Sequence, residues 1–138
     1  MILLCNLILT IIFLIISFFH FYWAFGGPIG KTESVPITDK GILLFKPGFL
    51  ACFIVGLGFL IFIFLLYLPS LNLLPERLSK GLLWLLAIVF LMRVIGDFNY
   101  LGIFKKVKNT SFSKSDNRYF VPLCFLIMIL IIAKILAM

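Results

Sequence analysis

Charged side chains are scarce in this sequence, and acidic ones are scarcer still. Only 12% of the 138 residues are charged, and the chain has 5 Asp and Glu against 12 Lys and Arg. Hydrophobic residues make up 64% of it, and 17% are aromatic. Such a composition excludes an ordinary soluble globular protein and indicates an integral membrane protein.

Cysteine and histidine are too few and too scattered for a metal site or a disulfide framework. The 3 cysteines, Cys5, Cys52 and Cys124, stand far apart without a C-x-x-C motif, and His20 is the single histidine. A structural zinc site takes about four such ligands. We therefore expect no metal, no cofactor and no disulfide, and we expect the cysteines to behave as small apolar side chains.

The net charge of +7 raises the question of a nucleic-acid partner. The basic residues lie between apolar runs and form no aromatic-interleaved groove and no known nucleic-acid-binding motif. We expect no nucleic acid. The expected partner is the lipid bilayer, with anionic lipids at the basic segment 105–118, because Lys and Arg beside a membrane are attracted to anionic headgroups.

Four apolar runs of membrane-spanning length occupy residues 2–25, 49–68, 81–98 and 120–137. A helix needs about 20 residues to cross ~30 Å of hydrocarbon. A cleaved signal peptide is the alternative for the first run, but no basic segment precedes it and no small-residue cleavage site follows it. The sequence predicts an all-α fold, a single domain over residues 1–138 that forms an integral membrane bundle of four transmembrane helices.

Basic residues are divided unequally between the two sides of the membrane that four crossings define. The first and third connecting segments together carry eight, against three on the other side. The positive-inside rule therefore predicts a multi-pass protein of the cell membrane with both termini extracytoplasmic. The eight are Lys31, Lys40, Lys46, Lys105, Lys106, Lys108, Lys114 and Arg118, and the three are Arg77, Lys80 and Lys134.

The first connecting segment, residues 26–47, is long for a simple connection. It contains Gly26, Gly27 and Pro28 in a row and a second apolar patch at residues 42–45. Structureless loops longer than about 12–15 residues are uncommon unless they are functional or disordered. Two interpretations remain open, a segment that folds back onto the membrane face as a lid and a plain tether.

Arg93 is the one charge clearly inside an apolar run, and Asp97 follows it by four residues. Residues four apart share one helix face. An ionised side chain in a bilayer is usually kept for a site or a helix–helix contact. We expect Arg93 to pair first with Asp97, and second with His20 or a carbonyl group.

The predicted direction of the helices brings further polar and aromatic side chains to this depth. The candidate ligand-binding residues are those near the predicted cytoplasmic ends of the spans. They are His20, Trp23, Arg93, Asp97, Tyr100 and Tyr119. The ordinary alternative is that the aromatic residues form an interfacial belt and that His20 makes an interfacial hydrogen bond.

Three motifs resemble those of a known family. The run H-F-Y-W-A-F-G-G at residues 20–27 resembles a signature H-x-Y-W-A-x-G-G, and R-V-I-G-D-F at residues 93–98 resembles R-x-I-G-D-F. Residues 116–123, which include Asp116, Tyr119, Pro122 and Leu123, resemble D-x-x-Y-x-x-P-L. The chain is thus similar to a bacterial family of small four-span membrane proteins, domain-of-unknown-function family thirty-nine-ninety-five. The resemblance implies the four-span fold and supplies no activity.

Three classes of function follow from these features. The first is a polar site at the cytoplasmic membrane face that binds an anionic lipid-like or small ligand, with Arg93 holding the anionic group. Whether such a site has enzymatic turnover stays open, because no complete nucleophile–base set can be assembled. The alternative is a structural or accessory protein in which the Arg, Asp and His contacts only fix helix packing. Transport is less favoured, because the outer half of the spans has few polar groups and a pore would need an oligomer. The sequence leaves a homo-oligomer open.

Overall fold

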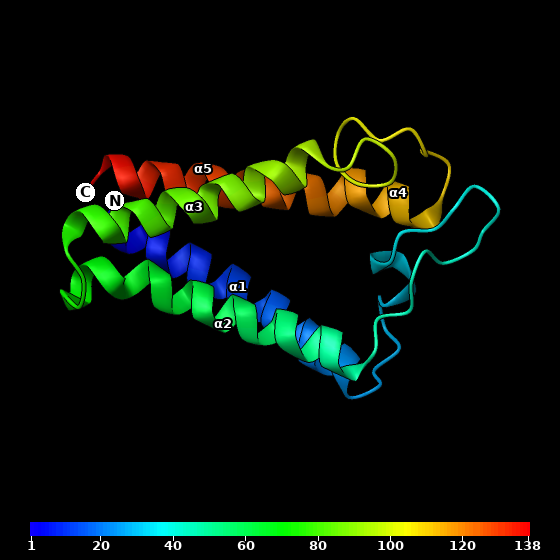
Figure 1. Cartoon of the computed structure of the whole chain (residues 1–138), viewed down its shortest axis with the longest axis horizontal. Helices are drawn as coiled ribbons and strands as arrows, with labels where there is room; N and C mark the ends of the chain where they lie inside the picture. The colour runs from blue at the N-terminus through cyan, green and yellow to red at the C-terminus, as the bar shows by residue number, and fades with distance from the viewer.

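The computed structural model describes all residues 1–138, and four long helices account for most of them (Figure 1). They are α1 (Ile2–Ala24), α2 (Phe49–Leu71), α3 (Glu76–Ile95) and α5 (Val121–Leu136). The short helix α4 (Ser111–Ser115) and a π-helical turn, η2 (Asp116–Phe120), run directly into α5. All four are long and apolar enough to cross a membrane, α5 as part of the continuous helical run Ser111–Leu136. The predicted all-α bundle is confirmed, and the protein is a multi-pass membrane protein.

Two helix boundaries on one side of the bundle differ from the hydropathy limits. Helix α2 continues through Pro69 to Leu71, because a proline in the last turn removes only one hydrogen bond of the helix. Helix α3 begins at Glu76, directly after Pro75, so Arg77 lies in the first helical turn and not in a loop. Charged residues lower the hydropathy of a segment without lowering its helix propensity, which explains the difference.

The opposite end of α3 also differs, and this difference matters for the site. The helix ends at Ile95, and Gly96 follows with a φ of 85°. A positive φ of this kind is a conformation that glycine adopts without steric cost, and it breaks the helical path. Asp97 and Phe98 were predicted to lie at the end of the span, but they lie beyond it in the connector to α4.

The helices pack as two pairs, α1 with α2 and α3 with α5 (Figure 1). The ribbons of the two pairs meet near the chain termini and diverge toward the end that carries the long loops. We call these the termini end and the loop end. Buried apolar residues shared by both pairs lie mainly toward the termini end. They are Leu9, Phe13, Leu66, Leu83, Leu86, Ala87, Phe90, Ile127, Ile131 and Ile135.

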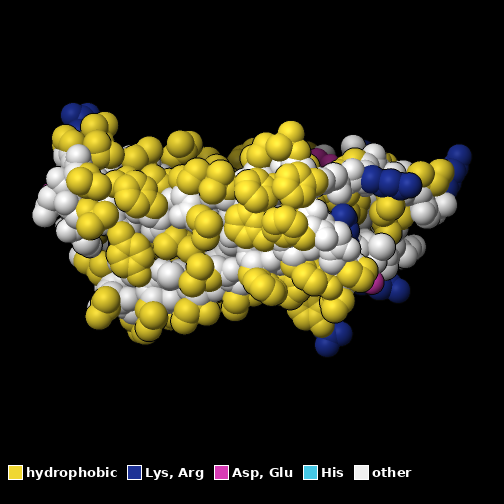
Figure 2. All heavy atoms as spheres, turned by 90° about the horizontal axis from the view of Figure 1, so that it is seen from below, with side chains coloured by type: hydrophobic (Ala, Val, Ile, Leu, Met, Phe, Trp, Pro, Cys, Tyr) yellow, Lys and Arg dark blue, Asp and Glu magenta, His cyan; other side chains and the backbone are white.

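Phe13 is the centre of this core. Its side chain is fully buried, and its ring lies 5.7 Å from that of Phe59, 5.9 Å from that of Phe62 and 5.8 Å from that of Phe90. The remaining helix surface is almost entirely hydrophobic, and Lys and Arg appear only toward the two ends (Figure 2). This surface is the one expected of helices that face lipid.

The first loop folds back against the loop end of the helices (Figure 1). It contains a 3-10 turn, η1 (Thr32–Ser34), that contacts α4, and an isolated antiparallel bridge between Ile37 and Leu43. Within this loop the side chain of Val35 is buried, at 4% exposure. The apolar patch is itself outside this packing, since Ile42 is 62% exposed.

Replacing Phe13 with Ala should lower the free energy of unfolding by about 2–3 kcal/mol, because a cavity is left even where lipid and not water surrounds the protein. Unfolding by SDS in mixed micelles, followed by circular dichroism, measures the change. The matched control is Phe18→Ala on the same helix, where the ring is 65% exposed and the effect should stay below about 0.5 kcal/mol. Equal losses in the two variants would contradict the described packing of Phe13.

Candidate functional site

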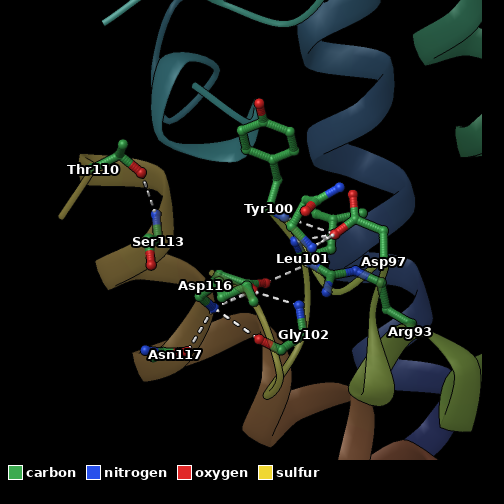
Figure 3. A network of polar contacts seen from close by, with 11 residues as sticks. Arg93, Asp97, Tyr100, Leu101, Gly102, Thr110, Ser113, Asp116 and Asn117 are labelled. Carbon is green, nitrogen blue, oxygen red and sulfur yellow. Dashed lines mark hydrogen bonds and ion pairs between the residues drawn. The ribbon is translucent and has the colours of Figure 1, made fainter. Parts of the chain in front are cut away.

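A buried carboxylate, that of Asp116, is the centre of the polar contacts at the loop end (Figure 3). Its Oδ1 accepts a hydrogen bond from Nη2 of Arg93 at 2.6 Å, and its Oδ2 accepts one from Nζ of Lys105 at 2.6 Å. The backbone N–H of Gly102 donates to the same Oδ2 at 3.0 Å. Asp116 is fully buried and the Lys105 side chain is 1% exposed, so both ion pairs are shielded from water on at least one side.

The local sequence explains why this carboxylate points inward. Thr110 caps α4, accepting a hydrogen bond from the N–H of Ser113 at 3.1 Å. The π-helical turn η2 then starts at Asp116. A π-turn has more residues than a regular α-helical turn, so it changes the direction in which its side chains point. The next residue, Asn117, accepts a second hydrogen bond from Lys105 at 2.6 Å.

The charges of this cluster do not balance. Two cations, Arg93 and Lys105, share the single carboxylate of Asp116, which leaves one net positive charge. The other terminal nitrogen of Arg93, Nη1, is buried and has no hydrogen-bond partner within the protein. A buried carboxylate with two cationic donors is well compensated, whereas loss of that carboxylate would leave both cations uncompensated.

The expected pairing of Arg93 with Asp97 is wrong. Asp97 Oδ1 instead accepts hydrogen bonds from the N–H groups of Asn99, Tyr100 and Leu101 at 2.9, 2.7 and 2.8 Å (Figure 3). Partial burial raises the pKa of Asp97, but these three donors lower it more, so the net pKa lies below the ordinary value and the group is ionised at neutral pH. The four-residue spacing failed as a guide because the helix ends between the two residues.

His20 and Trp23 belong to a different place, a cavity of about 200 Å³ beneath the first loop. Lys31 is the one charged residue in its lining, and the remainder is mainly apolar, with Cys52 and Val55 of α2 among the lining residues. The cavity therefore has one cation and no acid. Neither Arg93 nor Asp97 contributes to it.

Hydrogen bonds fix the two aromatic side chains of the cavity. The Nδ1 atom of His20 lies 2.8 Å from the carbonyl oxygen of Ile16, so it carries the hydrogen and leaves Nε2 as a free acceptor in the neutral ring. The indole N–H of Trp23 donates to the carbonyl of Ile29 at 2.7 Å, which ties the first loop to the end of α1. The two rings lie 5.1 Å apart in an edge-to-face arrangement.

The side chains of the two predicted tyrosines make no hydrogen bond to the other candidate residues, although the backbone N–H of Tyr100 donates to Asp97. Tyr100 projects from the connector after α3, away from Asp116 and toward the first loop (Figure 3). Tyr119 is 56% exposed, and its ring lies 5.4 Å from the guanidinium carbon of Arg118. This exposed cation–π contact fits an interfacial position. The six predicted residues thus occupy several places and not one site.

Sequence reasoning missed three residues that the structure makes important. Asp116 and Lys105 were considered only as parts of the basic segment 105–118, although Asp116 opens the third family motif. Lys134 was counted with the loop charges, but it is 1% exposed within α5 and donates to Oδ1 of Asn6 at 2.6 Å. Its position inside an apolar run was the available signal, because an intramembrane lysine needs a partner. This contact joins α5 to α1 at the termini end.

Comparison with known protein families shows to which family the chain belongs. Residues 13–131 match the family described as a protein of unknown function, DUF3995. The chain belongs to this family. The matched region contains the cavity and the Asp116 cluster, whereas Asn6 and Lys134 lie outside it. No curated protein and no solved structure matches the chain. Membership in DUF3995 therefore confirms the resemblance seen in the three motifs and brings no activity with it.

Replacing Asp116 with Asn should lower the free energy of unfolding by about 3 kcal/mol, because the two cations that it holds lose their counter-charge. SDS unfolding in mixed micelles measures the loss. Asp39→Asn is the matched control, since Asp39 lies on the surface of the first loop and makes no ion pair. Unchanged stability of the Asp116 variant would show that the cluster is not buried as described.

Proposed function

We propose that the protein binds an anionic, lipid-like ligand in the cavity at the loop end, with the anionic group held by Lys31 and His20. The observation that carries this proposal is the charge of the cavity lining, which has one cation, one neutral imidazole and no acid. A ligand with a single negative charge complements such a lining. An apolar chain attached to that charge complements its remaining walls.

The hydrogen-bonding capacity of the two polar groups supports an anion. The Lys31 ammonium makes one long hydrogen bond within the protein, 3.4 Å to the carbonyl of Trp23, and its other N–H groups are free to donate to a ligand. The Nε2 atom of His20 accepts from a ligand O–H when the ring is neutral and donates to an anion when it is protonated. Together these groups suit a phosphate that keeps one proton, whose O–H donates to Nε2 of the neutral ring while its anionic oxygens accept from Lys31.

The size of the cavity limits what it encloses. Its volume of about 200 Å³ is smaller than the ~300–1,000 Å³ of pockets that surround a whole small molecule. It has room for a headgroup and the first part of an attached chain. Ala51 and Val55 line the cavity and are also exposed on the surface of α2, so a longer chain has a path along this helix into the surrounding lipid.

This proposal moves the anion-binding role from Arg93 to Lys31. Arg93 already donates to Asp116 at 2.6 Å, whereas Lys31 has no acidic partner. Trp23 and His20 keep the role that the sequence suggested for them. No catalytic step is part of the proposal.

A structural or accessory role is the second candidate, and specific contacts favour it. Asp116 joins α3 and the following connector to the start of α5, and Lys134 joins α5 to α1. Polar contacts between membrane helices contribute only ~0.6 kcal/mol on average but fix one arrangement among many. In this function the cavity would be empty, and the loop end would serve as a contact surface for another membrane component.

We also propose that the loop end faces the cytoplasm. Lys105 and Lys134 are buried, and removing them from the eight and three basic residues leaves seven at the loop end against two at the termini end. A membrane-impermeant thiol reagent should therefore label Lys114→Cys in inverted membrane vesicles and not in intact cells. Arg77→Cys, at the other end, should behave in the opposite way. Labelling of Lys114→Cys in intact cells would contradict this orientation.

Native mass spectrometry of the protein released gently from its own membrane tests the ligand proposal. The wild type should carry a bound species that Ala51→Phe and Lys31→Gln lose, since the first fills the cavity and the second removes its cation. The matched controls are Leu50→Phe, at an exposed position beside the cavity lining, and Lys40→Gln, an equal loss of charge elsewhere on the first loop. An empty wild type that is folded, or a species retained by both cavity variants, would favour the structural role.

A further inference from the structure

The connector between α3 and α4, residues 96–110, folds back on the helix that precedes it. The N–H of Ile103 donates to the carbonyl oxygen of Val94 at 2.9 Å, which places Ile103 beside the last turn of α3. Gly96 and Gly102 make this return possible. A Cβ at Gly96 would collide with the carbonyl oxygen of Leu101, and both glycines have a positive φ, 85° and 80°. Because α3 spans the membrane, the returning chain lies at the depth of the helix end.

Several backbone N–H groups of this connector are paired within the protein. Asp97 accepts three of its N–H groups, Asp116 accepts that of Gly102, and the carbonyl oxygen of Asn99 accepts those of Lys106 and Val107 at 3.1 and 3.0 Å. Pairing of this kind inside the protein lowers the cost of placing a non-helical segment at the depth of a membrane-spanning helix end.

The apolar side chains of the connector point away from the protein. Phe98, Ile103 and Phe104 are 57%, 55% and 61% exposed, and the rings of Phe98 and Phe104 lie 6.3 Å apart. Phe98 has a φ of 63°, a left-handed conformation that is costly for a bulky residue. Contacts of the ring within the protein do not offset this cost, because most of the ring is exposed. An apolar environment around the exposed ring would offset the cost of the Phe98 conformation.

We propose that this connector is a membrane-inserted wedge whose partner is an anionic lipid leaflet. Its apolar tip, Phe98, Ile103 and Phe104, lies among the acyl chains next to the end of α3. Lys106 and Lys108, which follow the tip and are exposed, lie at the headgroups and attract anionic lipid. Lys105 takes no part in this attraction, since its ammonium is bonded to Asp116.

Depth and charge favour lipid over a protein partner for this surface. The tip is level with a membrane-spanning helix end, where lipid is the surrounding medium. The one acid of the connector, Asp97, is exposed and has its Oδ1 occupied by three backbone donors, and the two exposed lysines, Lys106 and Lys108, outnumber it, so the charge near the tip is positive on balance. In this arrangement the Asp116 cluster holds the wedge at its depth through Gly102 and Lys105.

Spin labelling in lipid nanodiscs tests the insertion. A nitroxide at Phe104→Cys, in a full-length chain with Cys5, Cys52 and Cys124 changed to Ala, should collide at least about threefold more with oxygen than with a water-soluble nickel complex. Ile103→Cys is a second site in case the first variant does not fold. The control Lys114→Cys, exposed on α4, should show the reverse preference. A label at both tip sites that is reached mainly by nickel, or by neither agent because protein covers it, would overturn the proposal.

Lipid charge is tested by the association of spin-labelled phosphatidylglycerol with the protein in phosphatidylcholine nanodiscs. Lys106→Gln combined with Lys108→Gln should lower the preference for the anionic lipid by about twofold or more. The matched control is Lys40→Gln combined with Lys46→Gln, which removes the same charge from the first loop and should change the preference little. An unchanged lipid preference in the Lys106 and Lys108 double variant, or an equal decrease in both double variants, would overturn the role of the connector lysines. Neither experiment depends on the cavity, so its outcome is separate from that of the ligand proposal.

Discussion

The buried carboxylate of Asp116 is the interaction on which the loop end depends. It bonds to Arg93 in α3, to Lys105 and Gly102 in the connector, and it stands at the start of the helical run into α5. Each of these groups would be costly to bury alone, because a charge removed from water must be compensated where it lies. The carboxylate therefore sets the position of α3 relative to α5 and the path of the chain between them. The hydrogen bonds within the connector and the exposure of Phe98, Ile103 and Phe104 follow from that path.

The two ends of the bundle are held by different forces. At the termini end, large apolar side chains around Phe13 interlock, and Lys134 and Asn6 add one polar contact. Lipid is as apolar as these side chains, so close packing and not removal from water holds this end. At the loop end the pairs of helices diverge, and polar contacts and folded loops take over (Figure 1). This division explains why the cavity, the ion cluster and the proposed wedge all lie at one end, where the fold does not depend on continuous packing.

Hydropathy predicted the four helices because lipid exposure leaves a long, continuous signal in the sequence. It could not place the end of α3, which depends on Gly96 and on backbone contacts with Leu101. The predicted pairing of Arg93 with Asp97 was wrong for this reason. Without that pairing, the six candidate residues do not form a single site. Asp116 escaped notice because its importance comes from the fold-back of the connector, a long-range event that local spacing does not show. His20 and Trp23 were placed correctly at the loop end because they lie on one uninterrupted helix, whose direction alone fixes their depth.

Internal pairing of the acids gives the loop end its chemical character. Asp116 forms ion pairs with two cations, and Asp97 accepts hydrogen bonds from three backbone N–H groups. Three lysines of the loop end, Lys31 in the cavity and Lys106 and Lys108 on the connector, form no ion pair with either carboxylate. Under both proposals such a surface would attract anions, while Asp116 stabilises the fold. The structural contacts and the proposed binding thus use different cations of the loop end, since Arg93 pairs with Asp116 whereas Lys31 has no acidic partner.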